Sequence, residues 1–264
     1  THYESVVGTG QAESISSDVM TPTDLLEHYA FAKHTILVGD KGSGKTYTAS
    51  KFLSGKLNTI RFDGHCGVEA MDLKGYLIRF AGEDGVEKCV WQDGALAQAF
   101  RQASNGQKTV LLVDEIGRIP QAEQSIFVSA LTKDFDGNYS FNTGRVVNVV
   151  DGVAQTEVLT VPSDMLWVVG TTNVGAEYNV DDMESALKDR FRFVRMDSSA
   201  DGIKSVLSAY CKKFKMKKAV GTKLVKLYQG LIALCNNDLI SHEPNMRHLC
   251  EVVELAKGED DIVN

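Results

Sequence analysis

The feature that most constrains this chain is a glycine-rich segment between a short apolar run and a helical pattern. Residues 35–38 (TILV) suit a strand that is buried on both faces. Residues 39–46 (GDKGSGKT) follow, and Ala49, Phe52 and Leu53 then recur at helical spacing. Glycines let backbone N–H groups surround phosphate oxygens, and the N-terminus of the next helix adds its dipole. This order of strand, loop and helix predicts a phosphate-binding loop rather than a chance glycine-rich turn.

The residues of this loop have separate expected roles toward a nucleotide and its Mg²⁺ ion. Lys45 is expected to reach the β- and γ-phosphates, and Thr46 is expected to hold Mg²⁺. The whole segment is expected to bind the nucleotide: Gly39, Asp40, Lys41, Gly42, Ser43, Gly44, Lys45 and Thr46. ATP is the expected nucleotide because the chain carries no NKxD-like guanine signature, although first principles do not exclude GTP.

A second apolar run ends in two adjacent acids. Residues 110–113 (VLLV) lead into Asp114 and Glu115. Asp114 is placed to hold the Mg²⁺ shell, and Glu115 can orient and activate an attacking water. Such a run alone is common at surface strand ends, but it is specific when it follows a phosphate loop. A switch protein that only binds nucleotide would not need Glu115, so the pair favours hydrolysis.

The remaining pattern alternates strands with helices. Thr23 or Asp24 is expected to cap a short helix, and Asp93 is expected to cap a later one. Leu73, Tyr76 and Leu77 fall at helical spacing. Further strands are expected at residues 59–62, 166–170 and 193–196. Two hairpins are also expected: one includes residues 86–91, and the other pairs residues 146–150 with 158–161 around a turn at Asp151-Gly152.

This order predicts an α/β fold of the P-loop type, in which helices flank a parallel sheet. Residues 1–198 are expected to form the nucleotide-binding domain, and residues 199–264, whose pattern is helical throughout, a small C-terminal helical appendage. The boundary is expected near residues 197–199.

Charge and composition exclude several classes of protein. The net charge of −7 and the pI near 5.4 argue against a general affinity for nucleic acid. Residues 212–218 are rich in lysine and are expected to be a solvated helix face, with a local basic patch as the alternative. The five cysteines are scattered without a CxxC pair, and no apolar stretch could span a bilayer. A cytoplasmic protein without membrane contact is therefore expected.

Four motifs beyond the phosphate loop resemble those of one family. Residues 114–120 (DEIGRIP) resemble the DEINRxP of AAA+ ATPases of the MoxR type, and residues 186–191 (ALKDRF) resemble their aLxDRF. Residues 91–96 (WQDGAL) resemble their dGpL element. Residues 144–162, together with 171–173 (TTN), resemble their pre-sensor hairpin and sensor-1 segment. The motifs occur in the same order as in the family, and together they cover nearly all of residues 30–197. This group carries an insert in its second helix and also contains CbbQ/NorQ-like and CobS-like chaperones.

The resemblance implies roles for three further residues. Asn173 would be sensor 1, which bonds the attacking water or the γ-phosphate; a plain turn residue at a strand end is the alternative. Arg190 would be the arginine finger that enters the neighbouring subunit's site, although a solvated basic edge is a rival interpretation and Arg192 could share the role. Arg247 would be sensor 2 on the helical lid, residues 199–264. The helix-2 insert would occupy about residues 63–94.

The resemblance also implies a function. The chain would form a homo-oligomeric ring, expected to be a hexamer, that hydrolyses ATP with Mg²⁺. It would remodel a client protein or assist metal or cofactor insertion, commonly with a partner that carries a von Willebrand factor A domain. Two rival functions remain: an ATP-gated scaffold with little turnover, and an ATPase stimulated by nucleic acid. The last ranks third because the hairpin at about residues 144–162 holds Arg145 and little other positive charge.

Overall fold

A parallel sheet lies at the centre of the computed structural model, which describes residues 21–83, 85–173, 183–196, 207, 211–216, 218–237, 239 and 246–255. The sheet has five strands in the order β2-β5-β8-β1-β9, and every neighbouring pair is parallel. The strands are β1 (His34–Gly39), β2 (Asn58–Asp63), β5 (Thr109–Asp114), β8 (Leu166–Asn173) and β9 (Phe191–Arg195). The predicted α/β class, with helices flanking a parallel sheet, is confirmed.

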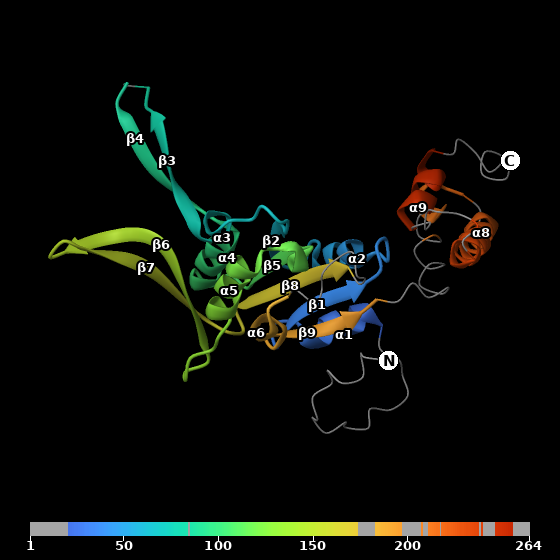
Figure 1. Cartoon of the computed structure of the whole chain (residues 1–264), viewed down its shortest axis with the longest axis horizontal. Coiled ribbons are helices and arrows are strands. Elements are labelled where there is room, and N and C mark those ends of the chain that lie inside the picture. Colours follow the sequence, from blue (N-terminus) through green and yellow to red (C-terminus); the bar gives the residue numbers. More distant parts are fainter. Residues whose placement is uncertain are drawn as a thin grey trace.

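Helices cover both faces of this sheet because its central strands, β1, β5 and β8, are buried and apolar on both sides (Figure 1). Ile36 faces a core shared with α4 and α5, whereas its neighbour Leu37 faces a core shared with α1 and α2. The helices are α1 (Pro22–Tyr29), α2 (Lys45–Leu53), α3 (Ala70–Lys74), α4 (Ala95–Ser104), the 3₁₀ turn η2 (Ile116–Arg118), α5 (Gln121–Ala130), α6 (Ser185–Lys188), α8 (Lys218–Asn236) and α9 (Met246–Leu255).

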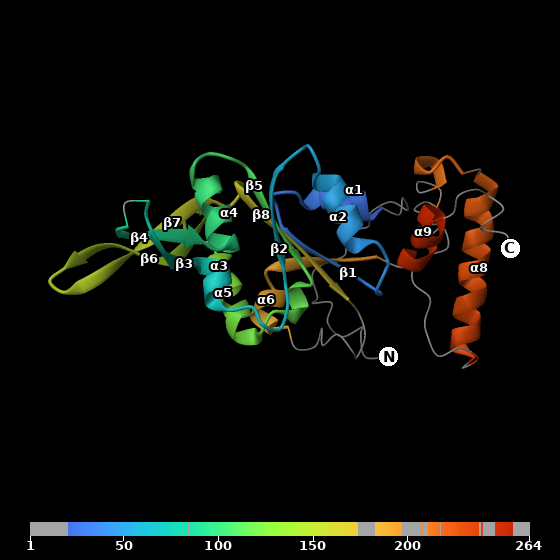
Figure 2. The ribbon, with the colours of Figure 1, turned by 90° about the horizontal axis from the view of Figure 1, so that it is seen from above.

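Two antiparallel hairpins project from the end of the molecule opposite to α8 and α9 (Figures 1 and 2). One consists of β3 (Gly75–Ala81) and β4 (Glu87–Asp93), and the other of β6 (Asn138–Val150) and β7 (Val153–Pro162). The second turns at Asp151-Gly152, both with positive φ as a tight hairpin turn requires.

The helix predicted from the spacing of Leu73, Tyr76 and Leu77 is wrong at Tyr76 and Leu77. Tyr76 and Leu77 belong to β3, where they pair with Gln92 and Trp91 of β4. The helix α3 contains Leu73 and ends at its cap Gly75, whose φ of 128° is open to glycine and disfavoured for other residues.

Both predicted helix caps are also wrong. Thr21, not Thr23 or Asp24, caps α1. Its hydroxyl accepts a hydrogen bond from the backbone N–H of Asp24, and the Asp24 carboxylate accepts one from the backbone N–H of Thr21. Gly94, not Asp93, occupies the cap position of α4. The Asp93 carboxylate instead accepts hydrogen bonds from side chains on β4 and α4.

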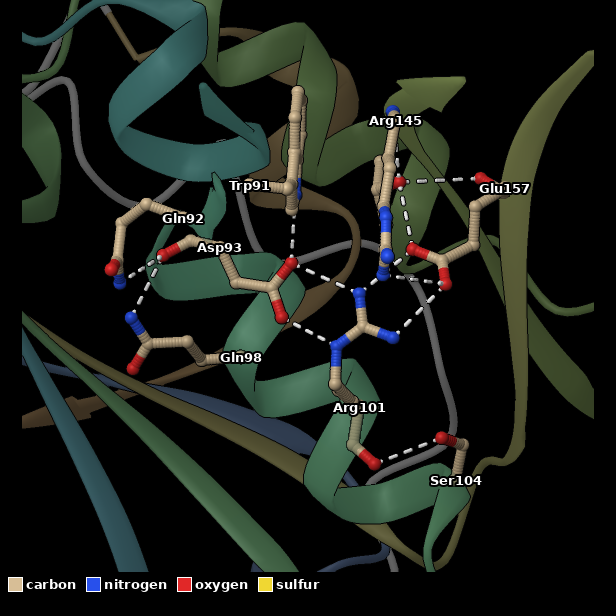
Figure 3. Close-up of polar contacts among 9 residues, drawn as sticks. Trp91, Gln92, Asp93, Gln98, Arg101, Ser104, Arg145 and Glu157 are labelled. Atoms are coloured by element: carbon tan, nitrogen blue, oxygen red, sulfur yellow. Dashed lines mark hydrogen bonds and ion pairs between the residues drawn. The ribbon is translucent and has the colours of Figure 1, made fainter. Parts of the chain in front are cut away.

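The side chain of Arg101 on α4 ties the two hairpins together (Figure 3). Its guanidinium donates two hydrogen bonds to Asp93 at the end of β4, at 2.5 and 2.9 Å. It donates two more to Glu157 on β7, at 3.0 and 2.7 Å. Trp91 also donates to Asp93, and Thr143 donates to Glu157. The base of the β3–β4 hairpin and the middle of β7 are therefore anchored to one helix by bidentate, charge-assisted bonds.

The described C-terminal helices have a core of their own. Leu224 on α8 and Leu249 and Val253 on α9 are buried in a cluster separate from the cores of the sheet. The predicted domain boundary at residues 197–199 lies outside the described residues. Among the helices described, none is both long enough and apolar enough to cross a membrane.

Candidate functional site

The carboxyl ends of β1, β5 and β8 meet at one edge of the sheet, and the glycine-rich loop closes over that edge. The loop joins β1 to α2, and its Gly44 is the N-cap of α2 with a φ of 84°. That left-handed backbone turns successive N–H groups toward the same side, as a phosphate cradle requires. The described loop has the backbone shape that the sequence predicts for a phosphate site.

Lys45 points into this edge rather than into solvent. Its side chain is 5% exposed, and Nζ donates to the carbonyls of Gly39 and Asp40 at 2.9 and 2.8 Å. A third bond, of 2.8 Å, goes to Oδ1 of Asn173 at the end of β8. Burial lowers the pKa of Lys45, and the carboxylates of Glu115, Asp40 and Asp114 oppose that shift.

Asp114, at the end of β5, lies beside two hydroxyl groups. Thr46 on α2 donates to Oδ1 of Asp114 at 2.7 Å, and Thr171 on β8 donates to the same oxygen. The register of β5 and β8, in which Val113 pairs with Gly170, brings Thr171 level with Asp114. A carboxylate is thus held against the threonine of the phosphate loop.

Glu115 follows immediately and has an unusual backbone. Its φ of 53° is left-handed, a conformation that non-glycine residues adopt chiefly where function or packing imposes it. Its N–H donates to the Thr171 hydroxyl at 3.0 Å, and its carboxylate accepts from Nδ2 of Asn173 at 2.6 Å. Asn173 therefore bridges Lys45 and Glu115, with its amide oxygen toward the cation and its amide nitrogen toward the anion.

The donor set suits a magnesium ion bound with nucleotide phosphates. The Thr46 hydroxyl and the Asp114 carboxylate are 2.7 Å apart at the head of the phosphate loop. Mg²⁺ prefers such oxygen ligands, usually one or two from protein together with water and phosphate oxygens. Within the described part of the chain no three His, Cys, Asp or Glu residues are grouped so as to hold a metal ion.

Arg190 lies at the other end of the sheet. It precedes β9, whose first residue, Phe191, pairs with His34 at the start of β1. His34 and Gly39 are five residues apart on one strand, which separates them by about 16 Å at the usual rise of a parallel strand. The guanidinium of Arg190 donates to the Ala186 carbonyl and the Thr132 hydroxyl, each at 2.9 Å. The structure does not bring Arg190 to the phosphate loop of its own chain.

The other predicted site residues have simpler placements. Arg192 is exposed on β9. Arg247 belongs to α9, but its side chain lies outside the described residues. The roles predicted for Arg190, Arg192 and Arg247 stay predictions.

Two residues of the site were not singled out from the sequence. Thr171 bonds both Asp114 and Glu115, but only the strand register, not the sequence, places it there. Gly64 donates its N–H to the Asp114 carbonyl at 2.7 Å, and an added Cβ would come within 2.6 Å of the Glu115 carbonyl oxygen. A glycine directly after a strand was the available signal for this close approach.

Comparisons with known proteins place the chain in a family. The crystal structure of NtrX from Brucella abortus in complex with ADP is similar with a TM-score of 0.47 and 16% identity. The match covers 90% of this chain and 49% of that one, so the chain spans about half the length of NtrX. No curated protein sequence matches the chain significantly. The family model described as "AAA domain (dynein-related subfamily)" matches residues 34–191. Since that match spans more than half of the chain, the protein belongs to the AAA domain family.

Proposed function

We propose that the chain is a ring-forming motor that hydrolyses the β–γ bond of ATP with the help of Mg²⁺. One observation carries this proposal: Lys45, Glu115 and Asn173 come from three segments and are joined by side-chain hydrogen bonds at the phosphate loop. Asp114, next to Glu115 in the sequence, accepts a hydrogen bond from Thr46 of that loop. An acid next to the metal-binding acid is what hydrolysis requires and what nucleotide binding alone does not.

The chain's own residues would divide the work as follows. Lys45 would neutralise the β- and γ-phosphates, while Thr46 and Asp114 would hold Mg²⁺, which supplies charge stabilisation for the leaving phosphate oxygens. Glu115 would accept a proton from the attacking water. Asn173 would hold that water or the γ-phosphate, because its amide already contacts Glu115 on one side and Lys45 on the other.

A ring is supported by the position of Arg190. Its separation from its own phosphate loop leaves a neighbouring subunit's site as the place where an arginine finger could act. Activity would then require assembly, and we propose a homo-oligomer, by resemblance a hexamer. Arg192 on the same strand could share the task.

Client remodelling, or assistance to metal or cofactor insertion, is supported by the two hairpins. They project from one end of the molecule, and β6 and β7 expose apolar side chains near the turn, among them Val147, Val149 and Val153. An exposed apolar surface of this kind marks a site of protein contact. A partner with a von Willebrand factor A domain is a proposal that rests on the family resemblance described above.

The experiment that tests the motor proposal is the rate of ATP hydrolysis per subunit across a wide range of protein concentration. A rate that rises steeply and then saturates supports a site completed between subunits. A flat rate from a chain that sizing shows to be monomeric would contradict it.

Two alternatives give different results in the same assay. A nucleotide-gated scaffold would form ATP-dependent oligomers with negligible hydrolysis, even when partners are present. An ATPase that acts on nucleic acid would be stimulated by DNA or RNA.

A further inference from the structure

A pocket of about 160 Å³ lies where β1, β6 and β9 begin, at the end of the sheet away from the phosphate loop. Its lining includes four cationic side chains from three segments of the chain: Lys33, Lys133, Arg190 and Arg192. Asp189 is the one acid among the residues that line it. The wall therefore carries a net charge of +3 when His34, which also lines the pocket, is neutral.

His34 is buried in this wall and has an unused hydrogen-bond donor. The side chain is 4% exposed, and its Nδ1 accepts the backbone N–H of Val168 at 3.0 Å. Burial, with Lys133 and Lys33 nearby, lowers the pKa of His34 to about 3, so the ring is neutral at physiological pH. Since Nδ1 is an acceptor, the single ring proton belongs on Nε2, which has no partner among the described residues.

Arg190 contributes a second unused donor to the same wall. Its two terminal nitrogens bond Ala186 and Thr132, but Nε is buried and has no partner in the described part of the chain. Buried donors are nearly always paired in native proteins, because an unpaired one has lost its water without a replacement. Both donors belong to residues that line one small cationic pocket. A ligand that is both anionic and rich in hydrogen-bond acceptors is therefore the fitting occupant.

We propose that this pocket binds a small oxyanion, such as inorganic phosphate, which accepts hydrogen bonds from Nε2–H of His34 and Nε–H of Arg190. The lysines and Arg192 supply the remaining positive charge. The site is separate from the phosphate loop, and its volume suits a single phosphate rather than a nucleotide. A bound oxyanion would also hold the Arg190 side chain within its own chain. This would compete with the insertion of Arg190 into the site of a neighbouring subunit.

The test uses the full chain saturated with ADP and Mg²⁺, because an empty phosphate loop would itself bind the probe. Inorganic phosphate is titrated at constant ionic strength and followed by calorimetry and by the NMR signal of the His34 Nε2–H group. The expected result is one saturable event, with the His34 signal shifting at the same midpoint. Absence of saturable binding, or a His34 signal that stays fixed at saturation, would overturn the proposal.

Charge variants then locate the binding. The double substitution Lys33→Met and Lys133→Met removes two exposed charges from the rim and should weaken phosphate binding about tenfold. The control, Lys223→Met and Lys226→Met, removes the same charge from the exposed face of α8 and should leave the affinity unchanged. Equal weakening in both would show a nonspecific response to net charge and contradict the site.

Discussion

Asn173 bonds a buried cation on one side and a carboxylate on the other, which makes the residues around it sensitive to single-atom changes. Glu115→Gln replaces the oxygen that would accept a proton with an amide, while its size is nearly unchanged. We expect kcat to fall by roughly a hundredfold or more, with ATP binding retained. Steady-state hydrolysis and equilibrium binding of a fluorescent ATP analogue measure the two effects. Glu123→Gln on α5 is the matched control, and near-normal turnover in Glu115→Gln would remove Glu115 from the mechanism.

Gly64 tests how closely the backbone must pack behind the two acids. The Cβ of Gly64→Ala would lie 2.6 Å from the Glu115 carbonyl oxygen and 2.9 Å from that of Asp114. Since backbone rather than a flexible side chain lies in the way, the acids must shift. We expect a large loss of turnover together with a lowered melting temperature. In the control Gly67→Ala, the new Cβ would meet nothing closer than 3.4 Å, so both quantities should stay unchanged. Normal turnover in Gly64→Ala would show that this close approach is dispensable.

At the scale of elements, the hairpins depend on one side chain of α4. Arg101→Met removes four hydrogen bonds and leaves Asp93 and Glu157 facing each other, 16% and 18% exposed. We expect a loss of about 2 kcal/mol of unfolding free energy, typical for bonds to charged groups that are partly shielded from water. Chemical denaturation measures it, and Arg79→Met on the exposed face of β3 is the control. Equal stability of the two variants would mean that the hairpins are held by packing alone.

The same cluster predicts how stability depends on pH. Hydrogen bonds from Arg101 lower the pKa of both Asp93 and Glu157 below their ordinary values. The two carboxylates therefore contribute fully to the free energy of unfolding at a pH above the ordinary pKa of a carboxyl group. That contribution is lost as the pH falls through their lowered pKa values. We expect the wild-type free energy of unfolding to decline there and Arg101→Met to decline less. Parallel acid profiles of the two proteins would contradict this assignment.

The centre of the sheet could be predicted from the sequence because β1, β5 and β8 are short apolar runs that need burial on both faces. The ends of elements could not. Tyr76 and Leu77 fit a helix by spacing, but Gly75 ends α3, and pairing with β4 decides their conformation. Asp93 looked like a helix cap because its partner, Arg101, is recognised only once β4 and α4 are folded together.

The site shows the same division between local and long-range information. The common location of Lys45, Asp114 and Glu115 could be predicted, because local motifs place them at the carboxyl ends of two strands of one parallel sheet. Thr171 could not, since its contacts depend on the register between β5 and β8, which no residue spacing states. The unused donor on His34 likewise appears only when β1 and β8 lie side by side.

At the scale of the whole molecule, the proposed function predicts that a neighbouring chain completes each ATP site. If Arg190 acts on a neighbour, Arg190→Ala should bind ATP almost normally and lose turnover, because the charge it supplies belongs to the transition state. ATP binding and hydrolysis are measured on the assembled protein, with Arg79→Ala as a control for the lost charge. Lost ATP binding in Arg190→Ala would instead make the residue structural.

Mixing two inactive variants distinguishes a shared site from a self-contained one. In a ring, a subunit with Arg190→Ala keeps Glu115, and a neighbour with Glu115→Gln keeps Arg190. Each interface at which these two subunits supply the intact residues to the same site regains a complete site. Random mixing of equal amounts should restore about a quarter of the wild-type rate, provided that each site joins one pair of neighbours. Neither variant alone should show this rate of hydrolysis. The restored activity should vanish when the protein is diluted below the concentration at which the ring assembles. If the mixture stays as inactive as its parts while sizing shows mixed rings, Arg190 and Glu115 do not act across a subunit boundary.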